Sequence, residues 1–338
     1  MQLMHAIAEN RLLSRWAAAL PRSPGQVGSV HQTDAELVPL GDGRLLALTV
    51  DTVLEEIELG LYRDPRTAGR VAAAAALSDL AAVGAEPLGL LLSVSLPSRD
   101  TEAVQQAVAE GVAQTCRAAG TFVLGGDTNE GRTLSVTCVA AGIVPMQGHL
   151  SRVGMAPGDT VFASGPLGSG TTFAAFALLG LAERERVESD WQPQQRIGEG
   201  KALRGIASAC MDTSDGLVAT VDQLVRLNQV ALRIDVPLDS LLDARSAALQ
   251  RALQLSALPF LAAPHGEFEL VFSVPESRLG ALESAAKAMS WRPLRLGRVE
   301  VGAGLFVGSA PLDGARLRNL AGAAPGDLGA YISALSAL

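Results

Sequence analysis

The stretch VAAAAALSDLAAVGAEP, residues 71–87, is the most informative part of this sequence. Its first twelve residues predict a helix that is apolar on almost every side, and such a helix is normally buried. Asp79 stands within it. An ionised carboxylate in a buried position is costly unless it is paired or binds a metal ion, and Asp is also a weak helix former. We therefore expect Asp79 to have a charged partner or a ligand.

Four further aspartates occur in comparable settings. Asp51 follows the apolar run LLALTV, Asp127 follows FVLGG, and Asp212 and Asp215 flank Thr213-Ser214 after ACM. Few basic residues lie close to these acids in the sequence. A hard divalent cation would resolve the electrostatic problem, and Mg²⁺ on nucleotide phosphates is the usual case. The alternative is that each Asp caps a helix or a turn, as the pair Asp215-Gly216 would allow.

Glycine stands beside two of these acids, in GGDT (residues 125–128) and SDG (residues 214–216). Glycine lets backbone amides approach a phosphate closely, and loops of this composition form anion sites. We therefore expect a loop over residues 125–132. The sequence contains no GxxxxGK[ST] motif, no GxSxG motif and no HExxH motif. A Walker-type NTPase, an α/β-hydrolase and a zinc protease are thus disfavoured.

Charge and composition limit the partners and the compartment. The chain has a net charge of −8 and a pI near 5.1, which argues against nucleic acid as its main partner. Its longest apolar runs are too short to cross a membrane, and its N-terminus lacks a signal-peptide pattern. The three cysteines are far apart and form no CxxC pair, so nothing indicates a disulfide framework. These features predict a cytoplasmic protein.

The order of the predicted elements indicates the fold class. At 338 residues the chain can form two domains, which we place at residues 1–150 and 151–338 because the turn-rich composition changes there. Short apolar runs such as residues 45–50 alternate with segments of helical spacing such as residues 101–118. This alternation predicts an α+β or α/β fold. Residues 3–20 predict an amphipathic helix with one apolar stripe, formed by Leu12, Leu13, Trp16 and Leu20.

Taken together, the motifs resemble the thiamine-monophosphate kinase family. This family belongs to a superfamily that also includes aminoimidazole ribonucleotide synthetase, selenophosphate synthetase and a hydrogenase maturation factor. The matching segments follow the same order as in the family, from about residue 30 to residue 275. They are DTVLE (51–55), LSDLAAVGAEP (77–87), GGDT (125–128), SR followed by PGD (151–159), SGPLG (164–168) and DTSDGL (212–217).

The resemblance implies a fold, a partner and a set of ligands. It implies an N-terminal mixed-sheet domain that forms a barrel with a second subunit, followed by a C-terminal α/β sandwich domain. It implies ATP and several Mg²⁺ ions as ligands, and a homodimer. The positions that match metal sites are Asp34, Thr49, Asp51, Asp79, Asp127, Asp212 and Asp215. Those that match the nucleotide site are Thr49, Gly125, Gly126, Asp127, Arg152 and Ser214.

The implied reaction is transfer of the ATP γ-phosphoryl group to thiamine phosphate, which gives thiamine diphosphate and ADP. Asp127 and Asp215 match catalytic positions, and Glu58, Glu267 and Phe268 match acceptor positions. The sequence departs from the family at several points. Thr33 replaces the first of two adjacent acids, and Glu58 stands where the family has a histidine that helps to hold the acceptor. The ATP side is therefore better matched than the acceptor side.

Two alternatives follow from these departures. One is an ATP-dependent synthetase of the same superfamily that activates an amide or carboxamide oxygen. The other is a nucleotide-binding protein without catalytic activity, since the replacements at residues 33 and 58 are what a decayed active site would show. The products of ATP turnover distinguish the three hypotheses.

Overall fold

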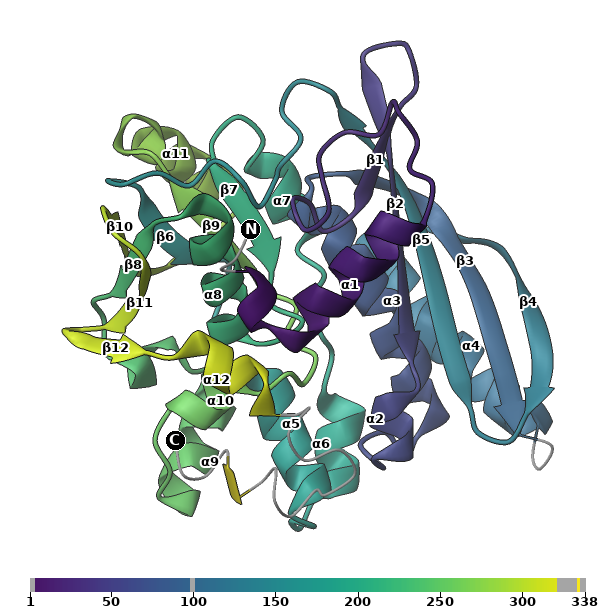
Figure 1. Ribbon diagram of the computed structural model, residues 1–338. Coiled ribbons are helices and arrows are strands. Elements are labelled where there is room, and N and C mark those ends of the chain that lie inside the picture. Colours follow the sequence, from purple (N-terminus) through teal and green to yellow (C-terminus); the bar gives the residue numbers. More distant parts are fainter. Residues whose placement is uncertain (1–3, 98–100, 321–332, 335–338) are drawn as a thin grey trace.

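The computed structural model describes residues 4–97, 101–320 and 333–334, and it contains two mixed β-sheets with helices packed against them (Figure 1). The first sheet has the strand order β1-β2-β5-β3-β4. Its strands are Glu36–Pro39 (β1), Arg44–Val53 (β2), Glu86–Pro97 (β3), Val123–Gly131 (β4) and Ser135–Pro145 (β5). All of its pairings are antiparallel except that of β3 with β4.

The second sheet has the order β12-β11-β8-β10-β6-β9-β7, and only the pairing of β11 with β8 is parallel. The expected α+β fold is thereby confirmed. The strands are Thr160–Ala163 (β6), Ala209–Asp212 (β7), Ala231–Ile234 (β8), Leu270–Val274 (β9), Leu294–Glu300 (β10), Gly304–Val307 (β11) and Ala310–Leu312 (β12).

Helices and 3₁₀ turns connect and cover the strands. No helix in the described part of the chain is both long enough and apolar enough to cross a bilayer. The helices up to residue 202 are η1 (Met4–Ala6), α1 (Ala8–Ala19), α2 (Glu55–Glu58), α3 (Pro65–Ala82), α4 (Thr101–Ala119), α5 (Ser169–Leu178), α6 (Arg184–Asp190) and α7 (Ile197–Ala202). The later ones are α8 (Leu217–Asn228), η2 (Leu238–Leu241), α9 (Ala244–Leu253), α10 (Leu258–Ala262), η3 (Glu276–Arg278), α11 (Leu279–Ala288) and α12 (Gly314–Arg318).

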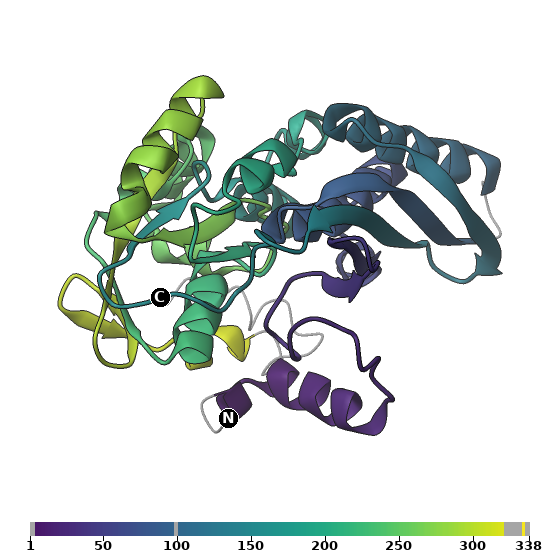
Figure 2. The same cartoon turned by 90° about the horizontal axis from the view of Figure 1, so that it is seen from above.

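Helix α3 lies between the two sheets and contacts both of them (Figures 1 and 2). Asp64 caps its first turn by accepting a hydrogen bond from the Arg66 amide, and Pro65 occupies its first position. Fourteen of its 18 residues are buried, as the alanine-rich sequence predicts. Ala81 and Ala82 pack with Leu270 and Phe272 of the second sheet. The two halves of the chain thus share a core around this helix.

Helices α3 and α4 cross closely because glycines stand at their contact. A Cβ atom at Gly111 would lie 1.9 Å from the Arg66 carbonyl oxygen, and one at Gly69 would lie 2.2 Å from the Val108 carbonyl oxygen. No side chain fits at such distances without moving a helix. The close approach leaves α4 covering the same face of the first sheet as α3 (Figure 2).

The opposite face of the first sheet is open in the described part of the chain. Along β2 and β5, alternate residues point to α3 and are buried, while the residues between them point away. The open face carries large apolar side chains. Val50 is 61% exposed, Leu91 46% and Leu124 60%. An apolar sheet face that is left open normally marks an interface.

The prediction of a loop over residues 125–132 is wrong. Residues 123–131 form β4, an edge strand that pairs in parallel with β3 in the register Ser93↔Asp127. Glycine and polar residues are poor strand formers, but the backbone hydrogen bonds to β3 outweigh that preference. Gly126 fits because its backbone passes close to β3, where a Cβ atom would lie 2.2 Å from the Leu92 carbonyl oxygen.

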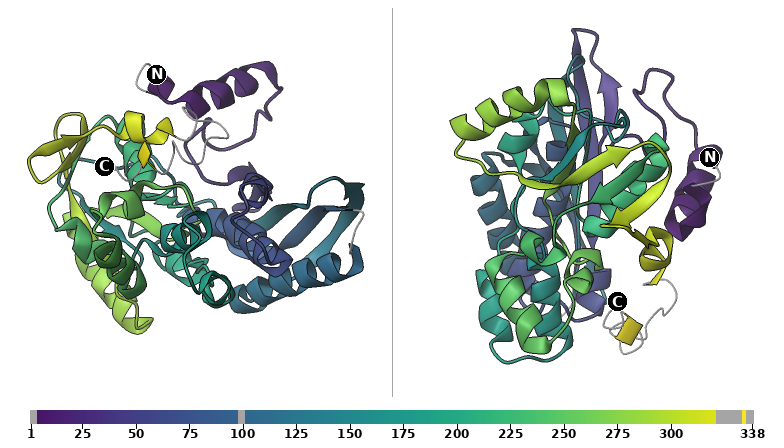
Figure 3. Two further views of the ribbon diagram at one scale, coloured as in Figure 1. Left: turned by 90° about the horizontal axis from the view of Figure 1, so that it is seen from below. Right: turned by 90° about the vertical axis from the view of Figure 1, so that its left-hand side faces the viewer.

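Helix α1 is present as predicted, but it buries its polar side. Asn10 is 2% exposed and donates from Nδ2 to the Gln223 side chain on α8 at 3.0 Å. The Ser14 hydroxyl lies 3.4 Å from His31 Nε2. The predicted apolar stripe instead faces outward, and Trp16 is 64% exposed. Figure 3 shows α1 at the edge of the molecule, beside α8 and α12.

We predict that Gly111→Ala destabilises the protein by about 1–3 kcal/mol, because the added methyl group overpacks the α3–α4 contact. The matched control is Gly280→Ala in α11, where a Cβ atom would meet no atom within 4 Å. That substitution should stabilise the protein by about 0.5–1 kcal/mol through helix propensity. Chemical denaturation of both variants measures the two effects. Equal stability of both variants would contradict the close helix contact.

Candidate active site

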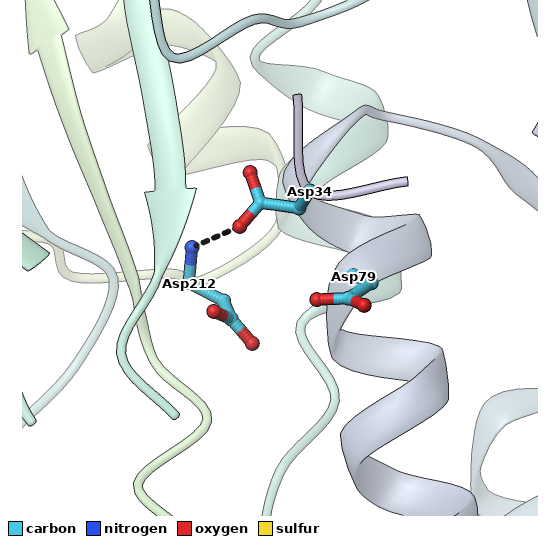
Figure 4. Close-up of side chains that lie close together, drawn as sticks. All are labelled: Asp34, Asp79 and Asp212. Atoms are coloured by element: carbon cyan, nitrogen blue, oxygen red, sulfur yellow. Dashed lines mark hydrogen bonds between the residues drawn. The ribbon is translucent and has the colours of Figure 1, made fainter. Parts of the chain in front are cut away.

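Three aspartates from distant parts of the chain converge between the two sheets. Asp34 precedes β1, Asp79 lies on α3, and Asp212 ends β7. One carboxylate oxygen from each lies within 4.8 Å of the others (Figure 4). The Asp212 amide also donates to Asp34 Oδ1 at 3.4 Å. The structure thus brings together three of the predicted metal-site residues, and their role as metal ligands stays a prediction.

Hydrogen bonds fix each carboxylate in place. The Thr49 hydroxyl donates to Asp79 Oδ2 at 2.5 Å, and the Ser78 hydroxyl donates to Asp212 Oδ2 at 2.7 Å. Arg152 forms an ion pair with Asp34 Oδ1 at 3.0 Å. Thr49 and Asp51 are two residues apart on β2, so both point towards α3. The strand therefore adds a fourth acid to the three that converge.

The acids raise one another's pKa values. Burial, and then the charges of Asp215, Glu56 and Asp34, raise the pKa of Asp51 to about 6. Burial and then Asp34 raise the pKa of Asp212 to about 7, against the hydrogen bond from Ser78. Burial and the charge of Asp51 raise the pKa of Asp79 well above its ordinary value. Without a cation, this site therefore favours protonated carboxyl groups.

Two oxygens of the site have no hydrogen-bonding partner among the residues that the structure describes. Asp34 Oδ2 and Asp51 Oδ2 are buried without a hydrogen bond, and polar atoms in that position are costly. The atoms of the site that could coordinate a metal ion are carboxylate and hydroxyl oxygens, which are the ligands that Mg²⁺ prefers. A divalent cation would satisfy the two oxygens and offset the repulsion. The residues present thus fit a magnesium site.

The comparisons with known proteins agree with this chemistry. Residues 32–144 match the family described as AIR synthase related protein, N-terminal domain. Over 286 residues the chain is 32% identical to the thiamine-monophosphate kinase of Escherichia coli (strain K12), which covers 83% of this chain and 86% of that protein. This chain belongs to the thiamine-monophosphate kinase family. The resemblance inferred from the motifs is confirmed.

Solved structures share the fold. The crystal structure of the thiamine-monophosphate kinase from Stenotrophomonas maltophilia K279a matches with a TM-score of 0.71 at 26% identity, over 90% of this chain and 98% of that one. The structure of AaThiL complexed with AMPPCP and TMP matches with a TM-score of 0.76, over 93% of this chain and 97% of that one. Its identity is 22%, so this second likeness shows the fold alone.

The residues predicted to bind the nucleotide differ in their distance from the three acids and in their exposure. Arg152 borders the three acids, with a side chain that is 17% exposed. Ser214 is half-buried and donates its hydroxyl to Asp212 Oδ1 at 3.1 Å. Asp215 is exposed, and its charge acts on both Asp51 and Glu9. These residues therefore lie at the rim of the carboxylate site.

Asp127 does not join the other acids within one chain. Across the first sheet it lies in one row with Ser93, Thr137 and Thr52, which places it three strands from β2. At about 4.8 Å per strand the separation is about 14 Å. The row lies on the open face of the sheet, whereas Asp51 faces α3. Gly125 and Gly126 lie on the same distant edge strand.

The predicted acceptor residues have different surroundings. Glu58 is exposed at the end of α2. Glu267 is buried and accepts hydrogen bonds from the Gly168 amide at 2.5 Å and the Ser169 hydroxyl at 3.0 Å. Burial, and then the charge of Glu269, raise the pKa of Glu267 to about 7. Phe268 is 4% exposed and packs in the core that includes α3. Their contact with an acceptor stays a prediction.

Two residues of the site were not predicted. Ser78 holds Asp212, and its position beside Asp79 in an otherwise apolar helix was the available signal. Glu56 has a buried Oε2 atom without a partner, and its charge raises the pKa of Asp51. It follows the DTVLE segment (51–55) directly, where the resemblance directed attention to Glu58 instead.

The raised pKa values predict a pH-dependent response to magnesium. Asp51 and Asp212 hold protons to higher pH in the folded than in the unfolded chain, so the stability that they contribute is complete below about pH 4. It is lost as the pH rises through about 6 and about 7. Mg²⁺ binds the ionised form, so excess MgCl₂ should raise the melting temperature more at about pH 8 than at about pH 5.

The measurement is thermal melting in EDTA and in excess MgCl₂ at both pH values. Asp79→Asn should reduce the magnesium-dependent rise, whereas Asp239→Asn, an exposed acid on η2, should leave it unchanged. The same rise at both pH values would show that these carboxylates do not bind the ion.

Proposed function

We propose that this chain transfers the γ-phosphoryl group of ATP to the phosphate of thiamine monophosphate, forming thiamine diphosphate and ADP. The observation that carries the proposal is the 32% identity to a thiamine-monophosphate kinase over 83% of the chain. The buried carboxylate site with two unpartnered oxygens supports it independently, because phosphoryl transfer from ATP requires bound magnesium.

The carboxylates would hold the metal. Asp34, Asp51, Asp79 and Asp212 supply oxygen ligands, Thr49 fixes Asp79, and Asp215 can reach a further ion from the rim. A Mg²⁺ ion bound there would neutralise negative charge on the phosphate oxygens of ATP. Arg152 is held by Asp34, so its remaining N–H groups are oriented for a phosphate oxygen. This division leaves positioning and charge neutralisation to the protein.

The reaction needs no general base. An anionic oxygen of the acceptor phosphate attacks the γ-phosphorus, and the bond from that phosphorus to the β–γ bridging oxygen breaks. ADP leaves with the electron pair of the broken bond, and no proton has to move first. The protein contributes alignment and electrostatic stabilisation of the transferring group.

The open face of the first sheet supports a homodimer. Its exposed apolar side chains include Val50, Leu91 and Leu124, and a second copy of the same face would bury them. A dimer would also explain Asp127, which lies about 14 Å from β2 in its own chain. We propose that Asp127 serves the phosphate site of the partner. The division into domains 1–150 and 151–338 stays a prediction.

The alternatives are less well supported. An amide-activating synthetase and a non-catalytic homologue are both disfavoured by the identity to a kinase over most of the chain. The intact carboxylate site speaks further against decay, because Thr33 leaves four other acids in place. Product analysis separates the hypotheses. A synthetase would release phosphate in the presence of its own acceptor without phosphorylating thiamine monophosphate.

We predict that the protein with Mg-ATP and thiamine monophosphate produces thiamine diphosphate, detected by mass spectrometry together with ADP. Asp212→Asn should lower kcat by a factor of about 100 or more, because it removes a charged metal ligand. The control Asp239→Asn should retain full activity. Mg-ATP binding without any thiamine diphosphate would show that the altered acceptor side serves another phosphate.

A mixing experiment tests the dimer. Asp127→Asn and Asp212→Asn should each be inactive alone, whereas subunits mixed after partial unfolding should recover about a quarter of wild-type activity, because half of the dimers then contain one intact site. If Asp127 acted within its own chain, the mixture would remain inactive. Sedimentation measures the oligomeric state of the same samples.

A further inference from the structure

A cavity lies between α11 and β10, on the face of the second sheet that carries Phe162 and Phe272. Its volume is about 940 Å³, within the usual range for small-molecule sites. Phe162, Leu282 and Trp291 form an apolar wall, and Arg295 and Arg298 line the other side. A lining of this kind suits a ligand that has both an apolar and an anionic part.

An irregularity in β10 aims both arginines into this cavity. Residues three apart on a regular strand point to opposite faces of a sheet. The register shifts between Arg295 and Gly297, so that Arg295 pairs with Phe162 and Arg298 pairs with Thr160. Phe162 and Thr160 both line the cavity. β-Bulges commonly redirect side chains beside functional sites.

Arg298 lies opposite a like charge. On its other side it pairs directly with Arg233 of β8, and like charges in that arrangement destabilise a sheet. Arg233 is neutralised by Glu300, whose two oxygens accept hydrogen bonds at 2.8 Å. The side chain of Arg298 has no hydrogen bond or ion pair with any residue that the structure describes. Arg298 is exposed, so its guanidinium is accessible to an anion in the cavity.

Among the other charged side chains that line the cavity, one more cationic group has no hydrogen-bonding partner. Arg295 is engaged by Asp235 in a bidentate pair at 2.5 and 2.7 Å. On α11, Glu283 and Lys287 line the cavity one helical turn apart. Among the described residues, the Lys287 ammonium likewise has no hydrogen-bonding partner. Lys287 and Arg298 therefore present two positive charges beside the apolar wall that have no hydrogen-bonded partner among the described residues, although the carboxylates of Glu283 and Asp235 also line the cavity.

We propose that this cavity binds a small amphipathic anion, with an apolar ring against Phe162 and Trp291 and a phosphate or carboxylate on Arg298 and Lys287. The site is separate from the carboxylate site. Asp212 pairs with Leu270 at one end of β9, whereas Thr160 pairs with Val274 at the other end. The proposal goes beyond the proposed kinase reaction and does not depend on it.

The test titrates 1-naphthyl phosphate into the full-length protein, with calorimetry and Trp fluorescence as readouts. Saturable binding is expected, and Arg298→Gln should weaken it at least about tenfold, because a hydrogen bond to a charged group is lost. The matched control Arg251→Gln, an exposed arginine on α9, should bind as wild type does. Trp291→Phe should remove most of the fluorescence change. Titration with 1-naphthoate shows whether the site prefers phosphate or carboxylate.

Three results would overturn the proposal. The first is unchanged affinity in Arg298→Gln, or no saturable binding at all. The second is displacement of the probe by excess thiamine monophosphate with Mg-ATP, which would place it in the kinase site. The third concerns stability: Arg298→Gln should melt at or above the wild-type temperature because a repulsion is removed. A lower melting temperature would show that Arg298 is a structural residue.

Discussion

Burial of several carboxylates in one place is the constraint on which the rest of the site depends. Asp34, Asp79 and Asp212 are held within reach of one ion by groups from α3, β2 and β7. Each hydrogen bond to an acid lowers the cost of its charge, but two oxygens remain without a partner. The folded chain thus holds carboxylates whose negative charge only a bound cation or a proton can neutralise. A donor set made only of oxygen atoms suits a hard metal ion.

The need to hold Asp79 close to Asp34 and Asp212 explains why α3 is rich in alanine. Small side chains let the helix pass between the two sheets and against α4, where glycines bring the backbones close. A helix with larger side chains would move Asp79 away from Asp34 and Asp212. The alanines therefore determine the geometry of the site, although none of them touches a ligand. Overpacking anywhere along the helix would affect both the core and the metal site.

The sequence was informative where a charged residue stands in a segment that is otherwise apolar and therefore expected to be buried. Asp79 in an apolar helix, and Asp51 and Asp212 at strand ends, indicated a cation site, and the structure brings Asp79 and Asp212 together with Asp34. Predictions from local composition failed where pairing with a distant strand determines the secondary structure. The glycines and Asp127 predicted a loop, yet the segment pairs with β3, because backbone hydrogen bonding to a distant strand is not visible in composition. Helix α1 was predicted from its apolar stripe, but the buried contact of Asn10 with α8 could not be read from spacing.

The separation of the acids along the chain has a consequence for biosynthesis. Asp34 and Asp79 leave the ribosome early, whereas Asp212 follows 133 residues after Asp79. Until β7 has been made, α3 has no second sheet to pack against, and the open face of the first sheet is also exposed. The nascent chain therefore passes through a long interval with uncovered apolar surface and no metal site. Exposed apolar surface of this kind makes a partly made chain prone to aggregation.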